Sequence, residues 1–380
     1  MKKTIIGMIS GLVLISACST EKSESLENFE FDLTQDTVMV DAGDEIINLQ
    51  YGLSSPELSK DGKYLFNYIF NQPKFDKINL ETLNFEETLE FEREGPNGIG
   101  NYVAGYALTD KDQIMMWSYG LHAIFDQNGE KVKDLNLDKI AGDEVGGSGY
   151  LPLRLIEHPE DSNIIFGLYV KWENYEYFLM KFDLLNESFE KIPLPETERL
   201  KEFRMDIESD GRPAGGFGPS PRPLAVDKRI IMTNIAFNEA YVYDMVLDSL
   251  YLIPWNSNLT GNKNEAKLPK KVEVEESGKY RNLFMESINF GPLSWDPISQ
   301  QFIRISYKST FGEELDEYGD LKVIDAEVFL TLIDKNLAII KETKLDNYKK
   351  EPSGHFFLNN TIWLYENIDD ELGFVRVKLD

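Results

Sequence analysis

The sequence has few of the residues that build disulfides, metal sites and nucleic-acid interfaces. It contains one cysteine, which allows no internal disulfide, and three histidines without the spacing of a zinc site. Its 39 basic residues are outnumbered by 66 acidic ones, which gives a formal charge of −27. Affinity for nucleic acid depends on clustered Lys and Arg, so no nucleic-acid partner is expected. No metal or cofactor is predicted either.

The apolar run at the amino terminus is too short to cross a membrane. Ile5–Ala17 follows two lysines and is shorter than the roughly 20 residues that a membrane-spanning helix needs. This arrangement is typical of a secretory signal peptide, which is predicted at residues 1–17. The run ends in Leu14-Ile15-Ser16-Ala17-Cys18, which resembles the lipobox of bacterial lipoproteins. Cys18 is therefore predicted to carry a lipid that anchors the protein to a membrane.

Residues 18–35 are predicted to be a lipidated, flexible tether, because they begin with a polar stretch that is poor in apolar residues. Ser19, rather than Asp, follows Cys18, and this resembles the outer-membrane sorting pattern of such lipoproteins. The predicted location is therefore the cell envelope, as an outer-membrane lipoprotein. Both a periplasmic and a surface-facing orientation fit these residues.

No long amphipathic helix follows the tether. Short runs rich in Ile, Val, Phe, Tyr and Trp alternate with turns of Gly, Asn, Asp and Pro, which indicates an all-β fold. The runs repeat as six units of roughly 50–70 residues, each worth about four strands, as in a β-propeller. Residues 36–380 are therefore predicted to form a six-bladed β-propeller. The strongest strands of the units are Tyr64–Tyr68, Gln113–Trp117, Ile164–Tyr169, Arg229–Thr233, Phe302–Tyr307 and Thr361–Tyr365.

The N- and C-terminal strands are expected to pair in the last unit. Phe374–Leu379 supplies a third strand to that unit, and no fourth strand follows it. The missing outer strand is either Thr37–Val40 or Glu45–Leu49, and its pairing with the last strand would close the propeller and remove an exposed sheet edge. A β-sandwich of two stacked sheets is the alternative, but six similar units fit it poorly.

Two long connections interrupt the repeat. Pro193–Pro223 and Asn256–Asn289 are expected to be loops, the second with a helical turn or more at Tyr280–Ile288. Loops of this length in a compact domain are usually functional or mobile. In a propeller they join an outer strand to the next inner strand, on the face where ligands bind.

The lipobox, Asp41–Leu49 and Glu92–Gly100 together resemble Bacteroidetes lipoproteins of the six-bladed β-propeller type, and in particular the domain of unknown function 4221 family. The resemblance covers nearly the whole mature chain. The turn at Glu94–Gly100 is similar to the Gly-Pro-Gly-Glu turns of related propellers, with Asn97 at the second glycine position. The family implies no established catalytic residues, so none is carried over.

Five side chains are candidate ligand-binding groups. Arg154, Arg212 and Arg222 lie in or beside loops that lead to inner strands, where their guanidinium groups would bind carboxylates or sulfates. The alternative is that these arginines only offset nearby acids. His355 directly enters the last inner strand and is the histidine expected to face a central channel. Asn97 belongs to a stretch that is either a structural turn or a ligand-facing loop.

Other residues are expected to have structural roles. His122 begins an outer hairpin and is expected at the surface. The aromatic residues of the strong strands are expected in the core between blades, namely Tyr68, Trp117, Tyr169 and Trp363.

These features favour a binding or interaction module whose partner is an envelope protein, a peptide or a glycan. The alternative is a propeller enzyme, a hydrolase or lyase, that acts on polysaccharide with carboxylates or His355 at the channel mouth. No Gly-x-Ser-x-Gly elbow is present, and 66 acidic residues are too many to single out a catalytic pair. An enzyme should show a deep polar pocket with a strongly perturbed carboxylate or histidine.

Overall fold

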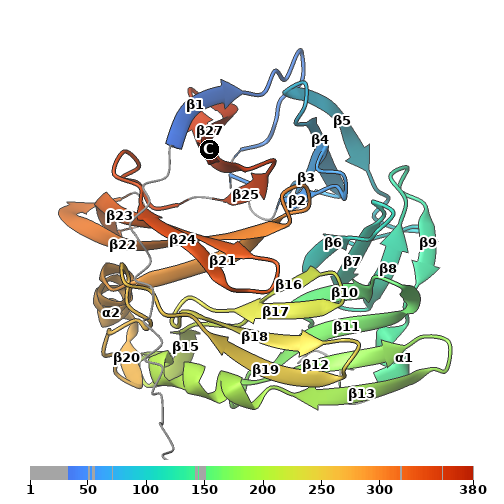
Figure 1. Ribbon diagram of the computed structural model, residues 1–380. Coiled ribbons are helices and arrows are strands. Elements are labelled where there is room, and N and C mark those ends of the chain that lie inside the picture. Colours follow the sequence, from blue (N-terminus) through green and yellow to red (C-terminus); the bar gives the residue numbers. More distant parts are fainter. Residues whose placement is uncertain are drawn as a thin grey trace, which may run out of the picture.

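The computed structural model of the chain describes residues 33–379, apart from 50–51, 54–55, 71, 142–143, 145–150, 317–318 and 353 (Figure 1). The predicted signal peptide, Cys18 and residues 18–32 of the predicted tether lie outside these described residues. The first strand begins at Leu33, slightly before the predicted start of the folded domain at residue 36.

Six four-stranded antiparallel sheets make up most of the described chain. The first sheet contains β2 (Glu57–Leu58), β3 (Tyr64–Tyr68), β4 (Lys74–Asn79) and β5 (Asn84–Glu90). The second contains β6 (Gly105–Leu108), β7 (Ile114–Ser118), β8 (Leu121–Phe125) and β9 (Lys131–Asp134). The third contains β10 (Arg154–His158), β11 (Asp161–Lys171), β12 (Glu176–Asp183) and β13 (Ser188–Pro193).

The fourth sheet contains β16 (Arg222–Val226), β17 (Arg229–Thr233), β18 (Glu239–Asp244) and β19 (Ser249–Pro254). The fifth contains β21 (Asn289–Asp296), β22 (Gln301–Leu315), β23 (Leu321–Asp334) and β24 (Ile339–Lys344). The sixth contains β25 (His355–Leu358), β26 (Thr361–Ile368), β27 (Glu371–Leu379) and β1 (Leu33–Met39). Each of the six strongest predicted strands overlaps the second strand of one sheet.

The first and last strands of the chain lie in the same sheet. β1 pairs antiparallel with β27, and Thr37 lies opposite Val375. The carboxylate of Asp36 accepts hydrogen bonds from Arg376 Nε at 2.8 Å and from its Nη2. Of the two segments considered for this outer strand, β1 contains most of Thr37–Val40, and Glu45–Leu49 forms no strand.

Apolar side chains cover both faces of each sheet, and successive sheets therefore share a core. Five buried clusters each join two sheets that are adjacent in chain order, and a sixth cluster, with Leu65 and Phe374, joins the first sheet to the sixth. Figure 1 shows the sheets following one another around the molecule. This propeller-like arrangement differs from a sandwich of two stacked sheets. The aromatic residues predicted for the core are all buried in these clusters, namely Tyr68, Trp117, Tyr169 and Trp363.

The two long connections are more regular than the sequence predicted. The first contains the 3₁₀ helix η2 (Pro195–Phe203), β14 (Met205–Ser209) and β15 (Arg212–Phe217). The second contains β20 (Lys271–Glu273) and the helix α2 (Val274–Glu286). β14 lies between β15 and β20 in a small mixed sheet, so the two connections fold together.

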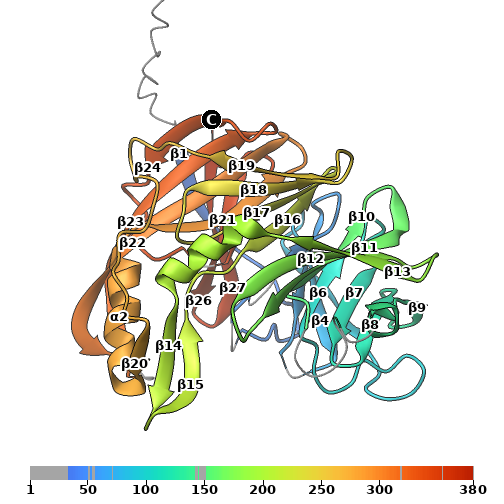
Figure 2. The ribbon, with the colours of Figure 1, turned by 90° about the horizontal axis from the view of Figure 1, so that it is seen from below.

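We call these five elements the insertion lobe. Figure 2 shows β14, β15, β20 and α2 grouped at one side of the molecule, beside β22 and β23. The phenyl ring of Phe284 packs edge to face on those of Phe203 and Phe217, at centroid distances of 5.6 and 5.3 Å. The helical turn predicted at Tyr280–Ile288 overlaps α2, but the other expected loop segments were wrong, because these three rings form a core only when both connections meet.

The predicted surface position of His122 was also wrong. The short helix α1 (Leu137–Ala141) follows β9, and its Asp138 lies 3.7 Å from His122 Nδ1. The His122 side chain is buried, and burial lowers its pKa. A helix of five residues leaves no periodic pattern in the sequence, so the burial of His122 beneath α1 was not predicted.

Arg304 in β22 is fully buried and connects the fourth sheet to the fifth. Its Nε donates to the Gly291 carbonyl at 2.8 Å and its Nη2 donates to the Asn234 carbonyl at 2.7 Å. Nη1 donates to Asn238 Oδ1 at 3.1 Å. Burial lowers the pKa of Arg304 to about 9. Two backbone carbonyls and the Asn238 side chain therefore satisfy the donors of this guanidinium group, as buried polar groups require.

A buried carboxyl group lies in the first sheet. Asp76 of β4 is 1% exposed and lies opposite Asn67 of β3. Its Oδ1 accepts a hydrogen bond from Thr88 Oγ1 at 3.4 Å, whereas its Oδ2 has no partner among the described residues. Burial raises the pKa of Asp76 to about 6.

The pairing of β1 with β27 predicts that a disulfide can join them. Opposed residues of an antiparallel pair lie about 4.5–5.5 Å apart at Cα, which is within disulfide reach. Thr37→Cys with Val375→Cys, on a Cys18→Ser background, should therefore oxidise and stabilise the protein by about 2–4 kcal/mol. Thermal unfolding with and without reductant measures the gain. The control pair Thr37→Cys and Val377→Cys is out of register and should not oxidise, and equal oxidation of both pairs would contradict the register.

Burial of Asp76 predicts a pH-dependent stability. The folded-state pKa lies above the usual value of 3.8, so the folded state loses stability as pH rises and the buried carboxyl group ionises. At about 1.4 kcal/mol per pKa unit, Asp76→Asn should stabilise the protein by up to about 3 kcal/mol at pH 7.5 and by little near pH 4. Urea unfolding at both pH values measures the difference. The exposed control Asp346→Asn should change stability equally little at both, and an Asp76→Asn effect that is independent of pH would refute the assignment.

Candidate functional site

The inner strands of the six sheets begin at one face of the molecule, which we call the entry face. β2, β6, β10, β16, β21 and β25 are the first strands of their sheets, and β6 contacts both β2 and β10. Because strands in a sheet alternate in direction, the turns between second and third strands lie at this same face. The two connections that form the insertion lobe lie at the entry face as well, because each joins an outer strand to the next inner strand. Three predicted residues, Arg154, Arg222 and His355, are the first residues of inner strands.

The positive charge of Arg154 is paired with a carboxylate of the protein itself. Its Nη1 lies 2.5 Å from Glu57 Oε1 and 3.1 Å from the Tyr106 carbonyl oxygen. Burial lowers the pKa of Arg154, but the adjacent Glu57 carboxylate raises it by more, so the net shift is upward. Arg154 therefore joins the inner strands of the first three sheets.

Arg222 is arranged differently. It is solvent-exposed at the start of β16 and makes no hydrogen bond or ion pair with any described residue. Although the side chain is exposed, the protein around the guanidinium group displaces some of its water and lowers its pKa. Tyr307 of β22 raises the pKa of Arg222. The pKa of Tyr307 is itself raised to about 12, by burial and by Glu351. A guanidinium group stays protonated at neutral pH, so Arg222 presents a positive charge beside Tyr307.

The other predicted residues occupy separate places. His355 begins β25, where it is half-buried and lies opposite Leu364 of β26. Arg212 is the first residue of β15, where it is exposed at the tip of the β14–β15 hairpin. β16 follows the other end of β15.

Asn97 belongs to a turn with internal hydrogen bonds. Ile99 N–H donates to the Glu92 carbonyl at 2.9 Å, and Asn97 Oδ1 accepts the Lys131 N–H of β9 at 3.1 Å. In this structure Asn97 thus links the connection after β5 to the outer strand of the second sheet.

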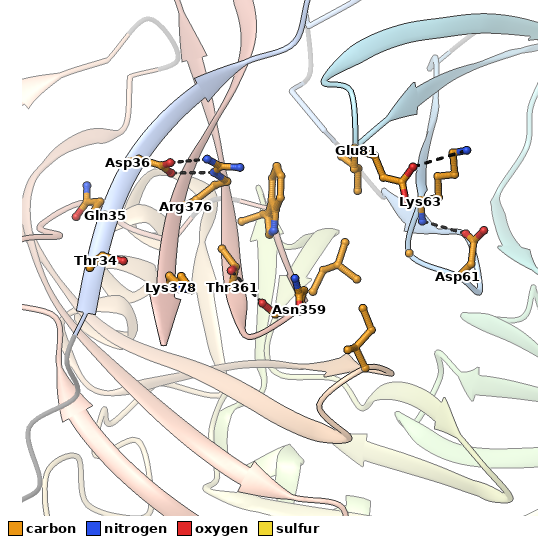
Figure 3. Close-up of a pocket in the computed structure, with 15 residues that line it drawn as sticks. Thr34, Gln35, Asp36, Asp61, Lys63, Glu81, Asn359, Thr361, Arg376 and Lys378 are labelled. Atoms are coloured by element: carbon orange, nitrogen blue, oxygen red, sulfur yellow. Dashed lines mark hydrogen bonds and ion pairs between the residues drawn. The ribbon is translucent and has the colours of Figure 1, made fainter. Parts of the chain in front are cut away.

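A cavity of about 610 Å³ lies at the opposite face, between the sixth and first sheets. Figure 3 shows the Asp36–Arg376 pair on one side of it and Lys63 with Glu81 on the other. A hydrogen bond from Arg376 lowers the pKa of Asp36. This cavity was missed by sequence reasoning, because its walls come from opposite ends of the chain.

The carboxyl groups here do not have the properties expected of a general acid. The pKa of Asp36 is lowered, and a hydrogen bond from Ser59 lowers that of Asp61, which also lines the cavity. The raised pKa of Asp76 belongs to a buried position in the first sheet. Within the described ranges, no group of three or more His, Cys, Asp and Glu side chains is placed to hold a metal ion. None of the helices in the described part of the chain is long and apolar enough to cross a membrane.

The fold is that of an all-β, propeller-like protein. The model of the family described as domain of unknown function (DUF4221) matches residues 28–344, so the chain belongs to this family. A member of the family from Bacteroides vulgatus is similar in structure, with 15% identity and a TM-score of 0.63 over 92% of this chain and 99% of that one. This structural likeness shows the fold alone. The match of the family model confirms the predicted family membership.

Two further solved structures are similar to a lesser degree. One is a protein of Bacteroides fragilis that is predicted to be exported, with 8% identity and a TM-score of 0.49 over 92% of this chain and 95% of that one. The other is the β-propeller domain of Cps50 from Myceliophteria thermophila, with 8% identity and a TM-score of 0.40 over 91% of this chain and 100% of that one. No curated protein matches this sequence.

Proposed function

We propose that this protein is an exported, lipid-anchored, six-bladed β-propeller of the cell envelope that binds an acidic ligand through Arg222. Six four-stranded sheets and six shared cores in cyclic order support six blades closed by the β1–β27 pairing. The signal peptide and lipobox pattern supports export and an anchor at Cys18, most simply in the outer membrane.

The unpartnered charge of Arg222 carries the proposal. Eight of the ten arginines donate hydrogen bonds to other groups of the described chain. The exceptions are Arg212 and Arg222, and only Arg222 lies at the start of an inner strand. Arg222 has no ionic or hydrogen-bonding partner among the described residues, although the protein has a net charge of −27, so this cation on the entry face is suited to bind a carboxylate or sulfate group.

The other charged side chains of the protein limit which ligands can bind beside Arg222. Glu57 already neutralises Arg154, so the two arginines do not act as an equivalent pair. The many acidic residues repel an anionic ligand elsewhere, which favours one acidic group presented at a defined position over a polyanion. The hydroxyl of Tyr307 is protonated at neutral pH, and we expect it to be an additional donor for the ligand.

Replacement of Arg222 should weaken binding of acidic ligands. Hydrogen bonds to charged groups contribute about 1.5–3 kcal/mol, so Arg222→Ala should reduce affinity about 10- to 100-fold. The probes are a xylo-oligosaccharide with a single glucuronic acid, a singly sulfated oligosaccharide and a peptide with a single glutamate, measured by calorimetry at low and physiological salt. Arg212→Ala is a matched control, because it also removes an unpaired arginine, and it should bind as the wild type does. Equal affinities for the wild type and Arg222→Ala would refute the proposal.

The lipid anchor predicts a change of location when Cys18 is replaced. The wild-type chain, expressed in a Bacteroidetes host, should partition into detergent with the membrane fraction, because several acyl chains hold a protein stably on a bilayer. Cys18→Ser should instead be recovered in the aqueous phase, and Ser19→Ala should behave as the wild type does. Detergent-phase partitioning and mass spectrometry of the amino-terminal peptide measure both outcomes. A membrane-bound Cys18→Ser protein would argue against the anchor.

A further inference from the structure

We infer that the ligand is a glycan and that the entry face carries a saccharide subsite beside Arg222, formed by Trp172, Tyr175 and Arg204. We call this group the aromatic corner. The assignment of an acidic sugar at Arg222 rests on the proposed function, whereas the stacking of a sugar on Trp172 does not.

The aromatic corner lies where the third sheet meets the insertion lobe. Trp172 and Tyr175 belong to the turn between β11 and β12, and Arg204 follows η2. Trp172 is 52% exposed, although an indole is among the side chains that gain most from burial. Its ring is nearly perpendicular to that of Tyr175, at 82°, with centroids 6.1 Å apart. These residues line a cavity of about 200 Å³, which suits one sugar ring.

The tyrosine and arginine of the corner hold each other in place. The guanidinium carbon of Arg204 lies 3.6 Å from the centroid of the Tyr175 ring, and Nη2 donates to the Tyr175 hydroxyl. Nε of Arg204 donates to Asp206 Oδ1 at 3.1 Å. Tyr175 has a φ of +54°, a backbone conformation that is rare for a bulky residue and that other contacts must maintain.

Gly216 makes room for this arrangement. A Cβ atom at this position would overlap the guanidinium group of Arg204. Gly216, Gly218 and Ser220 line the same cavity, so part of its wall is backbone with little side-chain cover. Such a wall offers peptide N–H and C=O groups to a polar ligand. The glycines of β15 and the connection that follows it thus contribute to the corner.

A sugar matches these groups better than an apolar ligand does. The C–H groups of a pyranose pack on the electron-rich face of an indole, while its hydroxyl groups need donors and acceptors around the ring edge. Arg204 and the Gly216–Ser220 backbone supply those donors and acceptors. An apolar ligand would leave them without partners at a cost of about 1–3 kcal/mol for each buried group.

The corner and Arg222 are close enough to bind one ligand. Ser220 lines the corner cavity and precedes Arg222 by two residues, so their Cα atoms lie within about 7 Å. A glycan that stacks one sugar on Trp172 can therefore place the carboxylate or sulfate of a neighbouring sugar at Arg222. This geometry points to an acidic glycan that also contains sugars with an unsubstituted pyranose face.

The test compares variants of the full-length lipoprotein with the wild type in detergent micelles. Trp172→Ala should reduce affinity for a xylo-oligosaccharide with a single glucuronic acid at least 10-fold and abolish weaker binding of neutral xylo-, cello- and manno-oligosaccharides. Arg222→Ala should reduce affinity for the acidic probe only. Tyr119→Ala is the matched control, because Tyr119 is 61% exposed in the corresponding turn of the second sheet, and it should bind as the wild type does. Calorimetry and saturation-transfer NMR measure binding, and thermal unfolding checks the fold.

The outcomes separate the two proposals. A loss in Trp172→Ala with no loss in Arg222→Ala supports the aromatic corner and refutes the role of Arg222. A loss in Arg222→Ala alone overturns the saccharide subsite at the aromatic corner and leaves the acidic ligand of the proposed function in place. Gly216→Ala keeps Trp172 but displaces Arg204, and it should also weaken binding of both probe classes. Failure of every oligosaccharide to bind the wild-type protein at millimolar concentration would overturn the inference as well.

Discussion

Apolar side chains on both faces of every four-stranded sheet require each sheet to be covered on two sides. A single sheet of this kind is unstable in water, because one neighbour can shield only one of its faces. Six clusters in cyclic order satisfy the requirement for all six sheets at once. The cluster with Leu65 and Phe374 is the one that makes the order cyclic, since it joins the first sheet to the last. The pairing of β1 with β27 completes the sheet on which that cluster depends.

The same packing determines where charge is available. Arg304 lies between two sheets and is satisfied by carbonyl and amide oxygens, and Arg154 is satisfied by Glu57 across inner strands. Both arginines serve the fold, because a buried or half-buried cation without partners would destabilise it. Arg222 occupies an equivalent place at the start of an inner strand but faces solvent without such partners. The difference between these residues lies in their surroundings, which is why a binding role is proposed for Arg222 and not for Arg154 or Arg304.

Much of the fold follows from local sequence patterns. Runs such as Tyr64–Tyr68 and Arg229–Thr233 predict strands correctly because buried strands need consecutive apolar and β-branched residues. Counting strands per unit predicts an outer strand from either Thr37–Val40 or Glu45–Leu49, and the structure forms it from the first. The insertion lobe could not be predicted this way, since Phe203 and Phe284 meet only after two distant connections fold against each other. His122 shows the same limit on a smaller scale, because α1 is too short to detect.

The candidate site was predicted only in part. The position of Arg222 and His355 at the start of inner strands follows from the repeat, and the structure places both there. Whether an arginine is paired depends on residues such as Glu57, which is 97 positions from Arg154, and no local pattern reveals that. Trp172 carried no signal in the sequence, because an exposed indole and a buried one have the same neighbours along the chain.

The sheet that joins the two ends of the chain also sets the order of events during biosynthesis. β1 is among the first segments to leave the ribosome, but its partner β27 is almost the last, and Asp36 and Arg376 are separated by 340 positions. A nascent chain therefore carries an unmatched strand edge for nearly the whole of its synthesis, which invites association with other chains. The sixth sheet can therefore be completed only when the last residues of the chain are available.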